Sequence, residues 1–172
     1  MTTERAPTVR LAIRSDAAAI ARIYNQGIED RIATFETEPR TVQQIEAQLA
    51  EKGDRYPTVV VERDGRVVAW ATVGSYRSRA CYAGTGEHSV YVERGARGSG
   101  AGRAALEGLF HACRARGFWK LVSRIFPENT PSLALHERAG FRVVGVYRRH
   151  GTLDGQWRDG VTYSLLRTDP AP

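Results

Sequence analysis

A strand, a glycine-rich loop and a helix follow one another between residues 86 and 116, and this succession constrains the fold more than any other feature. Residues 86–94 alternate between apolar and polar side chains, glycines stand at 98, 100 and 102, and an apolar helical stripe follows at Ala105, Leu106, Leu109, Phe110 and Cys113. A loop without side chains exposes its N–H groups, and the new helix adds the positive end of its dipole. The junction therefore predicts a site for a bulky anion such as a pyrophosphate.

The rest of the chain predicts one domain, residues 1–172, with a core over about 8–167. Hydrophobic periodicity and turn signals indicate helices at 17–29, 41–53 and 129–140, and strands at 8–14, 59–63, 67–73, 119–126, 141–148 and 160–167. Asp64-Gly65 is typical of a hairpin turn, whereas the last two strands are expected to flank a turn-rich segment. This order favours an α/β class, with a mixed sheet covered by helices on both faces.

Composition narrows the possible partners and the compartment. The chain has 25 Lys and Arg against 19 Asp and Glu, a net charge of +6, but the basic residues are scattered, so we expect no nucleic-acid partner. No apolar run is long enough for a membrane span, and the N-terminus resembles no export signal. Cys81 and Cys113 have no metal or redox spacing, which predicts reduced thiols in a cytoplasmic protein without a metal.

Three kinds of phosphate site use glycines in this way. A P-loop requires Gly-Lys-Ser/Thr, which Gly102-Arg103-Ala104 does not supply. A dinucleotide fold matches Gly100-x-Gly102-x-x-Ala105 in relaxed form, but too little chain follows for its further βα units, and Glu128 stands too far along for the expected acidic residue. The third kind is a coenzyme A loop.

The third possibility carries a family resemblance. Arg97-x-x-Gly100-x-Gly102 resembles motif A of the GCN5-related N-acetyltransferases (the GNAT superfamily), and Asn129 with Ala134-Leu-His-Glu-Arg-Ala-Gly-Phe141 resembles their next motif. The resemblance spans about residues 8–167. It implies the GNAT fold, a mixed and mostly antiparallel sheet of about six or seven strands with about four helices, and acetyl-CoA as the co-substrate.

Several blocks are similar to one branch, the phosphinothricin, arsinothricin and methionine sulfoximine N-acetyltransferases. They are 23–26, 33–39, 76–79 with Tyr82, 87–92, 129–137 and 155–159. This resemblance implies acetylation of the α-amino group of a small acidic amino-acid analogue, a detoxification or resistance activity, by a homodimer that shares its acceptor pocket. Thr152-Leu153-Asp154, Gly84 and Gly86 depart from the pattern near the expected pocket.

The resemblance also implies residues that hold the coenzyme. Backbone groups of the central strand would line the pantetheine arm, the loop would surround the phosphates, and the next helix would reach the arm; these residues are Val90, Tyr91, Val92, Arg97, Gly98, Ser99, Gly100, Ala101, Gly102, Asn129 and Ser132. An N–H of Tyr91 or Val92 would polarise the thioester carbonyl, and a β-bulge is one way to expose it.

The resemblance implies two catalytic residues: Glu87 as the general base, and His136 as the acid that reprotonates the thiolate. Strand alternation places Glu87, Ser89 and Tyr91 on one face, and His88, the second candidate base, on the other. Cys81 could instead act as a nucleophile, but direct transfer is favoured because no histidine adjoins it in sequence.

Acceptor recognition points to two arginines. Arg77 and Arg79, at i and i+2 of an extended segment, would share a face and hold an oxyanion. Phe35, Thr37 and Tyr82 would form the walls. Other hypotheses remain: an enzyme acting on another small amine or a protein N-terminus, a non-catalytic acyl-CoA sensor, and a nucleic-acid-binding module.

Overall fold

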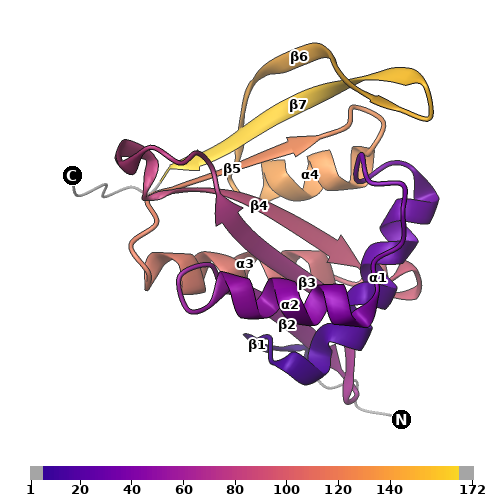
Figure 1. The fold of residues 1–172 in the computed structure, drawn as a ribbon, viewed down its shortest axis with the longest axis vertical. Coiled ribbons are helices and arrows are strands. Elements are labelled where there is room, and N and C mark those ends of the chain that lie inside the picture. The colour runs from indigo at the N-terminus through magenta and orange to yellow at the C-terminus, as the bar shows by residue number, and fades with distance from the viewer. Residues whose placement is uncertain (1–5, 167–172) are drawn as a thin grey trace.

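The computed structural model describes residues 6–166. In this range seven strands form one sheet in the order β1-β2-β3-β4-β5-β7-β6 (Figure 1), and only the β4–β5 pair is parallel. The strands are β1 Thr8–Leu11, β2 Thr58–Arg63, β3 Arg66–Ser75, β4 Thr85–Val92, β5 Lys120–Ile125, β6 Arg142–Leu153 and β7 Gln156–Leu166, and the helices are α1 Ala17–Asp30, α2 Val42–Lys52, α3 Ala101–Arg114 and α4 Thr130–Arg138. The predicted class and element order are confirmed.

The helices cover the two faces of the sheet and build a core on each. On one face, α1 and α2 bury Ile20, Ile23 and Ile45 against Trp70 of β3. On the other, the predicted stripe of α3 packs against β2, β3 and β5, and α4 adds its own apolar contacts. None of the described helices is long and apolar enough to cross a membrane.

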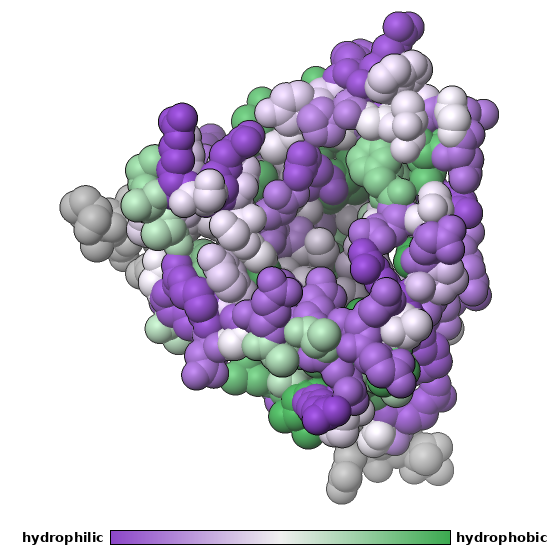
Figure 2. All heavy atoms as spheres, viewed as in Figure 1, coloured by the Kyte–Doolittle hydropathy of each residue, from purple (hydrophilic) through white to green (hydrophobic). Residues whose placement is uncertain are grey.

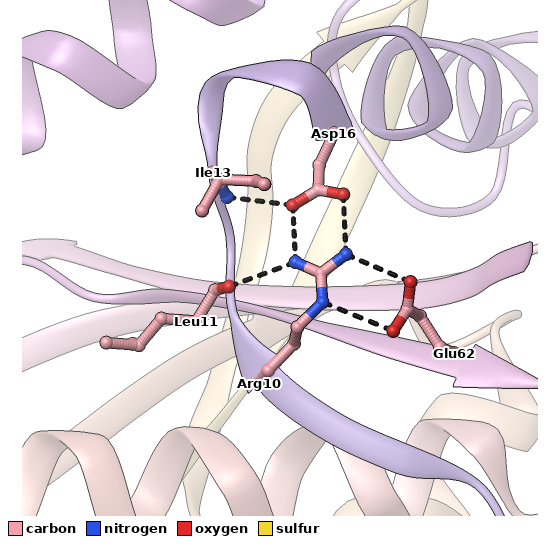
Figure 3. A network of polar contacts seen from close by, with 5 residues as sticks. All are labelled: Arg10, Leu11, Ile13, Asp16 and Glu62. Atoms are coloured by element: carbon pink, nitrogen blue, oxygen red, sulfur yellow. Dashed lines mark hydrogen bonds and ion pairs between the residues drawn. The ribbon is translucent and has the colours of Figure 1, made fainter. Parts of the chain in front are cut away.

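The first strand is joined to its neighbours by a partly buried charge network (Figure 3). Arg10 of β1 donates hydrogen bonds of 2.7 and 2.9 Å to the carboxylate of Asp16, just before α1, and of 3.0 and 3.2 Å to that of Glu62 on β2. Burial raises the pKa of Asp16, but hydrogen bonds from Arg10 and from the Ile13 amide outweigh it and leave the pKa lowered. The network joins the edge of the sheet to the start of α1.

The C-terminal hairpin differs from the prediction. The structure extends the last two strands through the expected turn-rich segment, so that β6 and β7 are joined only by Asp154 and Gly155. Both residues have positive φ, 49° and 74°, as have Asp64 (51°) and Gly65 (75°) in the β2–β3 turn. A two-residue turn with two positive φ values matches the twist of a hairpin, so Asp154-Gly155 carries the same signal as Asp64-Gly65.

The sheet opens between β4 and β5. Their register contains only three pairs, from Thr85↔Lys120 to Glu87↔Val122. Beyond Glu87, β4 continues along β3 as far as Val92, while β5 follows β7. The β3–β4 register is continuous. The expectation that a β-bulge exposes an N–H on β4 is therefore wrong. The divergence of two parallel strands frees that edge instead.

Candidate active site

A cavity of about 600 Å³ lies where β4 and β5 diverge. It extends between the C-terminal end of α1, the free edge of β4, the glycine loop and α4, and Figure 2 shows the molecule hollowed near the middle of one face. The predicted coenzyme residues in its lining are Val90, Tyr91, Val92, Arg97, Gly98, Gly100, Gly102, Asn129 and Ser132. The structure therefore brings together the strand, the loop and the helix that the sequence singled out.

The glycine loop lines one end of the strand edge that opens into this cavity. Gly98 and Gly100 adopt φ values of 76° and 85°, and a Cβ at either would meet no atom within 4 Å, so the loop presents open backbone. A Cβ on Gly102 would lie 3.1 Å from Leu135 and 3.2 Å from Val92, which shows how closely α3 approaches β4 and α4. The first N–H groups of α3 have no partner within the helix, and this cradle fits a pyrophosphate.

Cationic side chains border the cradle, and one carboxylate holds two of them. Arg97 and Arg94 bond to the carboxylate of Asp30 at 2.6 and 2.8 Å. Burial raises the pKa of Asp30, but Arg94 and Arg97 outweigh it, so the pKa lies below its ordinary value. Arg103 of α3 and Arg138 of α4 also line the cavity. The positive charge and the open backbone together suit a polyanionic ligand.

Two predicted coenzyme residues, Ser99 and Ala101, are not among the lining residues. The amide and the hydroxyl of Ser99 both turn back to the carbonyl of Ala96. Ala101 is 1% exposed and belongs to the core beneath α3. By contrast, Asn129 accepts a hydrogen bond from the amide of Ser132 at 3.3 Å, which caps α4 and holds both residues at the cavity.

Alternation along β4 divides its side chains between the two faces, as predicted. Tyr91 packs against Tyr24 and Trp70 on the α1–α2 face. His88 is 2% exposed and packs against His136 and Phe141 on the α3–α4 face. Glu87, which shares the face of Tyr91, is half-buried and occupies the last β4–β5 pair. Its carboxylate therefore stands at the point where the strands diverge.

His136 lies deeper than its expected role as acid requires. Its Nδ1 donates to the carbonyl of Ser132 at 2.8 Å, so its Nε2 accepts from Nε2 of His88 at 3.0 Å. Burial lowers the pKa of His136, and burial together with His136 lowers the pKa of His88 to about 3. The lowered pKa values favour the neutral form of both rings, and His136 does not line the cavity. This geometry favours a packing role over proton donation, because both nitrogens of His136 face protein atoms.

Glu87 has a partner that the sequence interpretation missed. Arg124 of β5 donates from Nε to Oε1 of Glu87 at 3.0 Å, and its Nη2 bonds to the same oxygen. Its Nη1 donates to Nε2 of His150 on β6 at 3.2 Å. An arginine in a central strand otherwise rich in buried residues was a signal for a specific role. The pairing itself depends on strand order, which the local pattern of β5 does not contain.

The predicted acceptor residues lie in two segments. Residues 76–79 form bends, not the extended segment that would put Arg77 and Arg79 on one face; both are exposed, and Arg77 lies over the ring of Tyr76. Tyr82 packs edge-on against Tyr76 at 5.6 Å between ring centroids. In the other segment, Phe35 meets Phe126 at 4.8 Å, and Thr37 is exposed.

The sequence departures have explanations in packing. A Cβ on Gly84 would lie 2.0 Å from the ring of Trp119, and one on Gly86 would lie 2.3 Å from Val73. These glycines therefore make room for neighbouring side chains. Their close contacts are with Trp119, Val73 and Phe118, not with the residues expected to form the acceptor pocket. Leu153 is 1% exposed, and Asp154 forms an ion pair with Arg31 at 3.1 Å.

The two cysteines differ in environment. Cys81 lies exposed in a short 3-10 turn, whereas Cys113 is buried in α3, where burial raises the pKa of its thiol to about 12. Neither is in a disulfide. Among residues 6–166, no group of three His, Cys, Asp or Glu side chains is placed to hold a metal ion.

The parallel strands β4 and β5 diverge and leave an open strand edge, and a glycine cradle precedes α3. Together these features define an acyl-coenzyme A binding fold. The family model described as "Acetyltransferase (GNAT) family" matches residues 20–141. The chain belongs to this family, an enzyme class that transfers acetyl groups from acetyl-CoA to amines.

Individual relatives narrow the group. The chain is 36% identical over 160 residues to phosphinothricin N-acetyltransferase of Streptomyces viridochromogenes, covering 92% of this chain and 87% of that one. It is 34% identical over 167 residues to L-methionine sulfoximine/L-methionine sulfone acetyltransferase of Salmonella typhimurium, covering 94% and 95%. The solved structure of yncA from Salmonella typhimurium, which holds acetyl-CoA, superimposes with a TM-score of 0.92 at 31% identity over 98% of each chain.

Proposed function

We propose that the protein transfers the acetyl group of acetyl-CoA to the α-amino group of a small acidic amino-acid analogue of the phosphinothricin, arsinothricin or methionine sulfoximine type, and so detoxifies it. One observation carries the proposal. Glu87 stands on the α1–α2 face at the last β4–β5 pair, beside the free strand edge of Val90–Val92 that leads into the glycine cradle. The named activities of the relatives support the choice of acceptor.

Three segments, the glycine loop, the edge of β4 and the start of α4, bind different parts of acetyl-CoA. The loop amides around Gly98, Gly100 and Gly102, with Arg97, receive the pyrophosphate, since they combine open backbone with positive charge. The unpaired edge of β4 receives the pantetheine arm as a strand would. Asn129 and Ser132 border the arm from α4.

Acetyl-CoA supplies an acetyl group activated as a thioester: the amine nitrogen bonds to its carbonyl carbon, and the carbon–sulfur bond breaks to release the thiolate of coenzyme A. The N–H of Val92 donates to the carbonyl oxygen as negative charge develops there, because the amide of Glu93 bonds to Val68 and the continuous register therefore turns the amide of Tyr91 toward β3 and that of Val92 toward the open edge. Glu87 accepts the proton that the ammonium must lose, directly or through one water. The nitrogen loses its second proton to solvent as the carbon–sulfur bond breaks. We assign the proton that reaches sulfur to solvent as well, because His136 is engaged with His88 and Ser132.

Thiol release tests the proposal. Wild-type protein with acetyl-CoA is assayed against phosphinothricin, methionine sulfoximine, methionine sulfone and a panel of simple amines. We expect release with the amino-acid analogues, and a kcat lower by about 10²- to 10⁴-fold in Glu87→Gln, with unchanged acetyl-CoA affinity. Binding of acetyl-CoA without release for any acceptor would indicate a sensor, and full activity of Glu87→Gln would remove the assigned base.

We also propose a cytoplasmic homodimer formed through the β6–β7 hairpin. An apolar group is exposed on these strands: Val143, Val144, Val146, Tyr147 and Trp157. β6 is an edge strand, with β7 as its only partner in the described sheet. Solvent-exposed apolar strands of this kind are commonly covered by a second chain. Sedimentation equilibrium of the wild type and of Val144→Glu tests this, and a monomer at micromolar concentration would refute it.

A further inference from the structure

The ion pair between Glu87 and Arg124 leaves part of each group available. Nε and Nη2 of Arg124 both bond to Oε1 of Glu87, and no hydrogen bond from the described residues reaches Oε2. A guanidinium has five N–H donors. Three are engaged, on Glu87 and His150, and the remaining two are one on each terminal nitrogen, with no partner within residues 6–166. These two N–H groups form a fork.

The surroundings of Arg124 hold this fork in place. His150 of β6 accepts from Nη1, so its Nε2 carries no proton, and its ring stacks on Tyr147 at 4.6 Å between centroids. Phe126 follows Arg124 by two residues and meets Phe35 edge-on. Contacts with Glu87 of β4 and His150 of β6 therefore hold the guanidinium of Arg124, whose side chain is 45% exposed.

We propose that Arg124 binds the α-carboxylate of the acceptor and thereby restricts the enzyme to free α-amino acids. This inference rests on the proposed function, in which Glu87 receives the proton of the α-amino group. The ammonium and the carboxylate of an amino acid are attached to the same carbon atom. Glu87 and Arg124 are likewise in direct contact, at 3.0 Å. An ammonium on Oε2 of Glu87 therefore places its neighbouring carboxylate beside the fork of Arg124.

The chemistry selects a carboxylate over its amide. Arginine and carboxylate form two parallel, charge-assisted hydrogen bonds, stronger than bonds between neutral groups. A peptide N-terminus or a simple amine offers no such anion at this position, so it loses both bonds and leaves the fork unmatched. Arg124 is thus a specificity-determining residue that separates free amino acids from protein N-termini.

Two acceptors that differ only at the α-carboxyl group test the proposal: L-methionine sulfone and its α-carboxamide. We expect wild-type kcat/KM to favour the free acid, and Arg124→Gln to lower kcat/KM for the free acid by about 10- to 150-fold, mainly through KM, while the value for the amide changes little. Arg124→Lys keeps the charge without the fork and should fall between the two. Arg114→Gln, at the exposed end of α3, removes one arginine far from the site and should match the wild type.

The outcomes separate this proposal from the one on which it rests. No thiol release by the wild type with either acceptor would overturn the proposed function itself. Turnover that is equal for acid and amide, or an equal loss for both in Arg124→Gln, would overturn only the carboxylate site, since an arginine that merely positioned Glu87 would affect both acceptors alike. Acetyl-CoA binding and the melting temperature show whether each variant is folded, and Arg124→Lys decides the question if Arg124→Gln is not.

Discussion

Replacing Arg10 with methionine is expected to lower the free energy of unfolding, because it leaves the buried carboxylate of Asp16 without its cationic partner. Arg10 donates two hydrogen bonds each to Asp16 and Glu62. The side chain of Glu62 is 30% exposed and can regain water, but that of Asp16 is 7% exposed and keeps only the Ile13 amide. The cost is therefore mainly that of the lost bonds to Asp16, about 1.5–3 kcal/mol in the free energy of unfolding.

Urea unfolding at pH 7 measures this cost, and thermal unfolding should show a melting temperature lower by about 3–12 °C. The double variant Arg10→Met/Asp16→Asn should recover part of the loss, because the unpaired charge is gone. Arg14→Met is the control: Arg14 pairs with Glu46 on the surface, where its side chain is 82% exposed, and we expect little change.

The pH dependence follows from the lowered pKa of Asp16. A carboxyl group whose pKa is lower in the folded than in the unfolded protein stabilises the fold above its unfolded value, 3.8, and loses that contribution as the pH falls through the folded value. The gap between wild type and Arg10→Met should therefore narrow below about pH 4. A gap that does not change with pH, or a loss no larger than that of Arg14→Met, would refute the charge argument.

Two further predictions concern the thiols and the coenzyme site. Iodoacetamide at pH 8 should label Cys81 rapidly and leave Cys113 unmodified until the protein unfolds, because Cys113 is buried and its thiol pKa is raised to about 12; labelling of both at equal rates in the native protein would contradict the buried assignment. Asp30→Asn should tighten acetyl-CoA binding several-fold at low salt, since it removes a carboxylate from a cavity for an anion and frees two arginines. Calorimetry with acetyl-CoA measures this, and weaker binding would mean that Asp30 instead orients those arginines.

The features that could be predicted from the sequence are those set by local runs of residues. The glycine loop and the alternation of β4 are set by short runs of residues, so both could be located before any contact was known. The β6–β7 hairpin was also within reach, since Asp154-Gly155 carries the same turn signal as Asp64-Gly65. The exposed strand β6 does not alternate, however, which obscured its length.

The features of the site that could not be predicted from the sequence depend on contacts between segments that are distant along the chain. Arg124 meets Glu87 only because β5 lies beside β4, although 37 residues separate them. His136 was expected at the coenzyme sulfur from its place in a motif, whereas the packing of α4 turns its ring toward His88. A motif locates a residue on a helix, but the neighbours of that helix decide where the side chain points.

The alternation of β4 also explains how one strand can serve two substrates. Residues of odd number from Glu87 to Tyr91 face α1 and α2, and His88 faces α3 and α4, while the strand edge itself opens toward the cavity. Because successive side chains of a strand point to opposite faces, a one-residue slip of β4 would exchange Glu87 for His88. The buried His88–His136 contact favours the observed register, since a one-residue slip would turn His88 away from α4 and break it. Packing on one face of β4 thus holds Glu87 in place on the other.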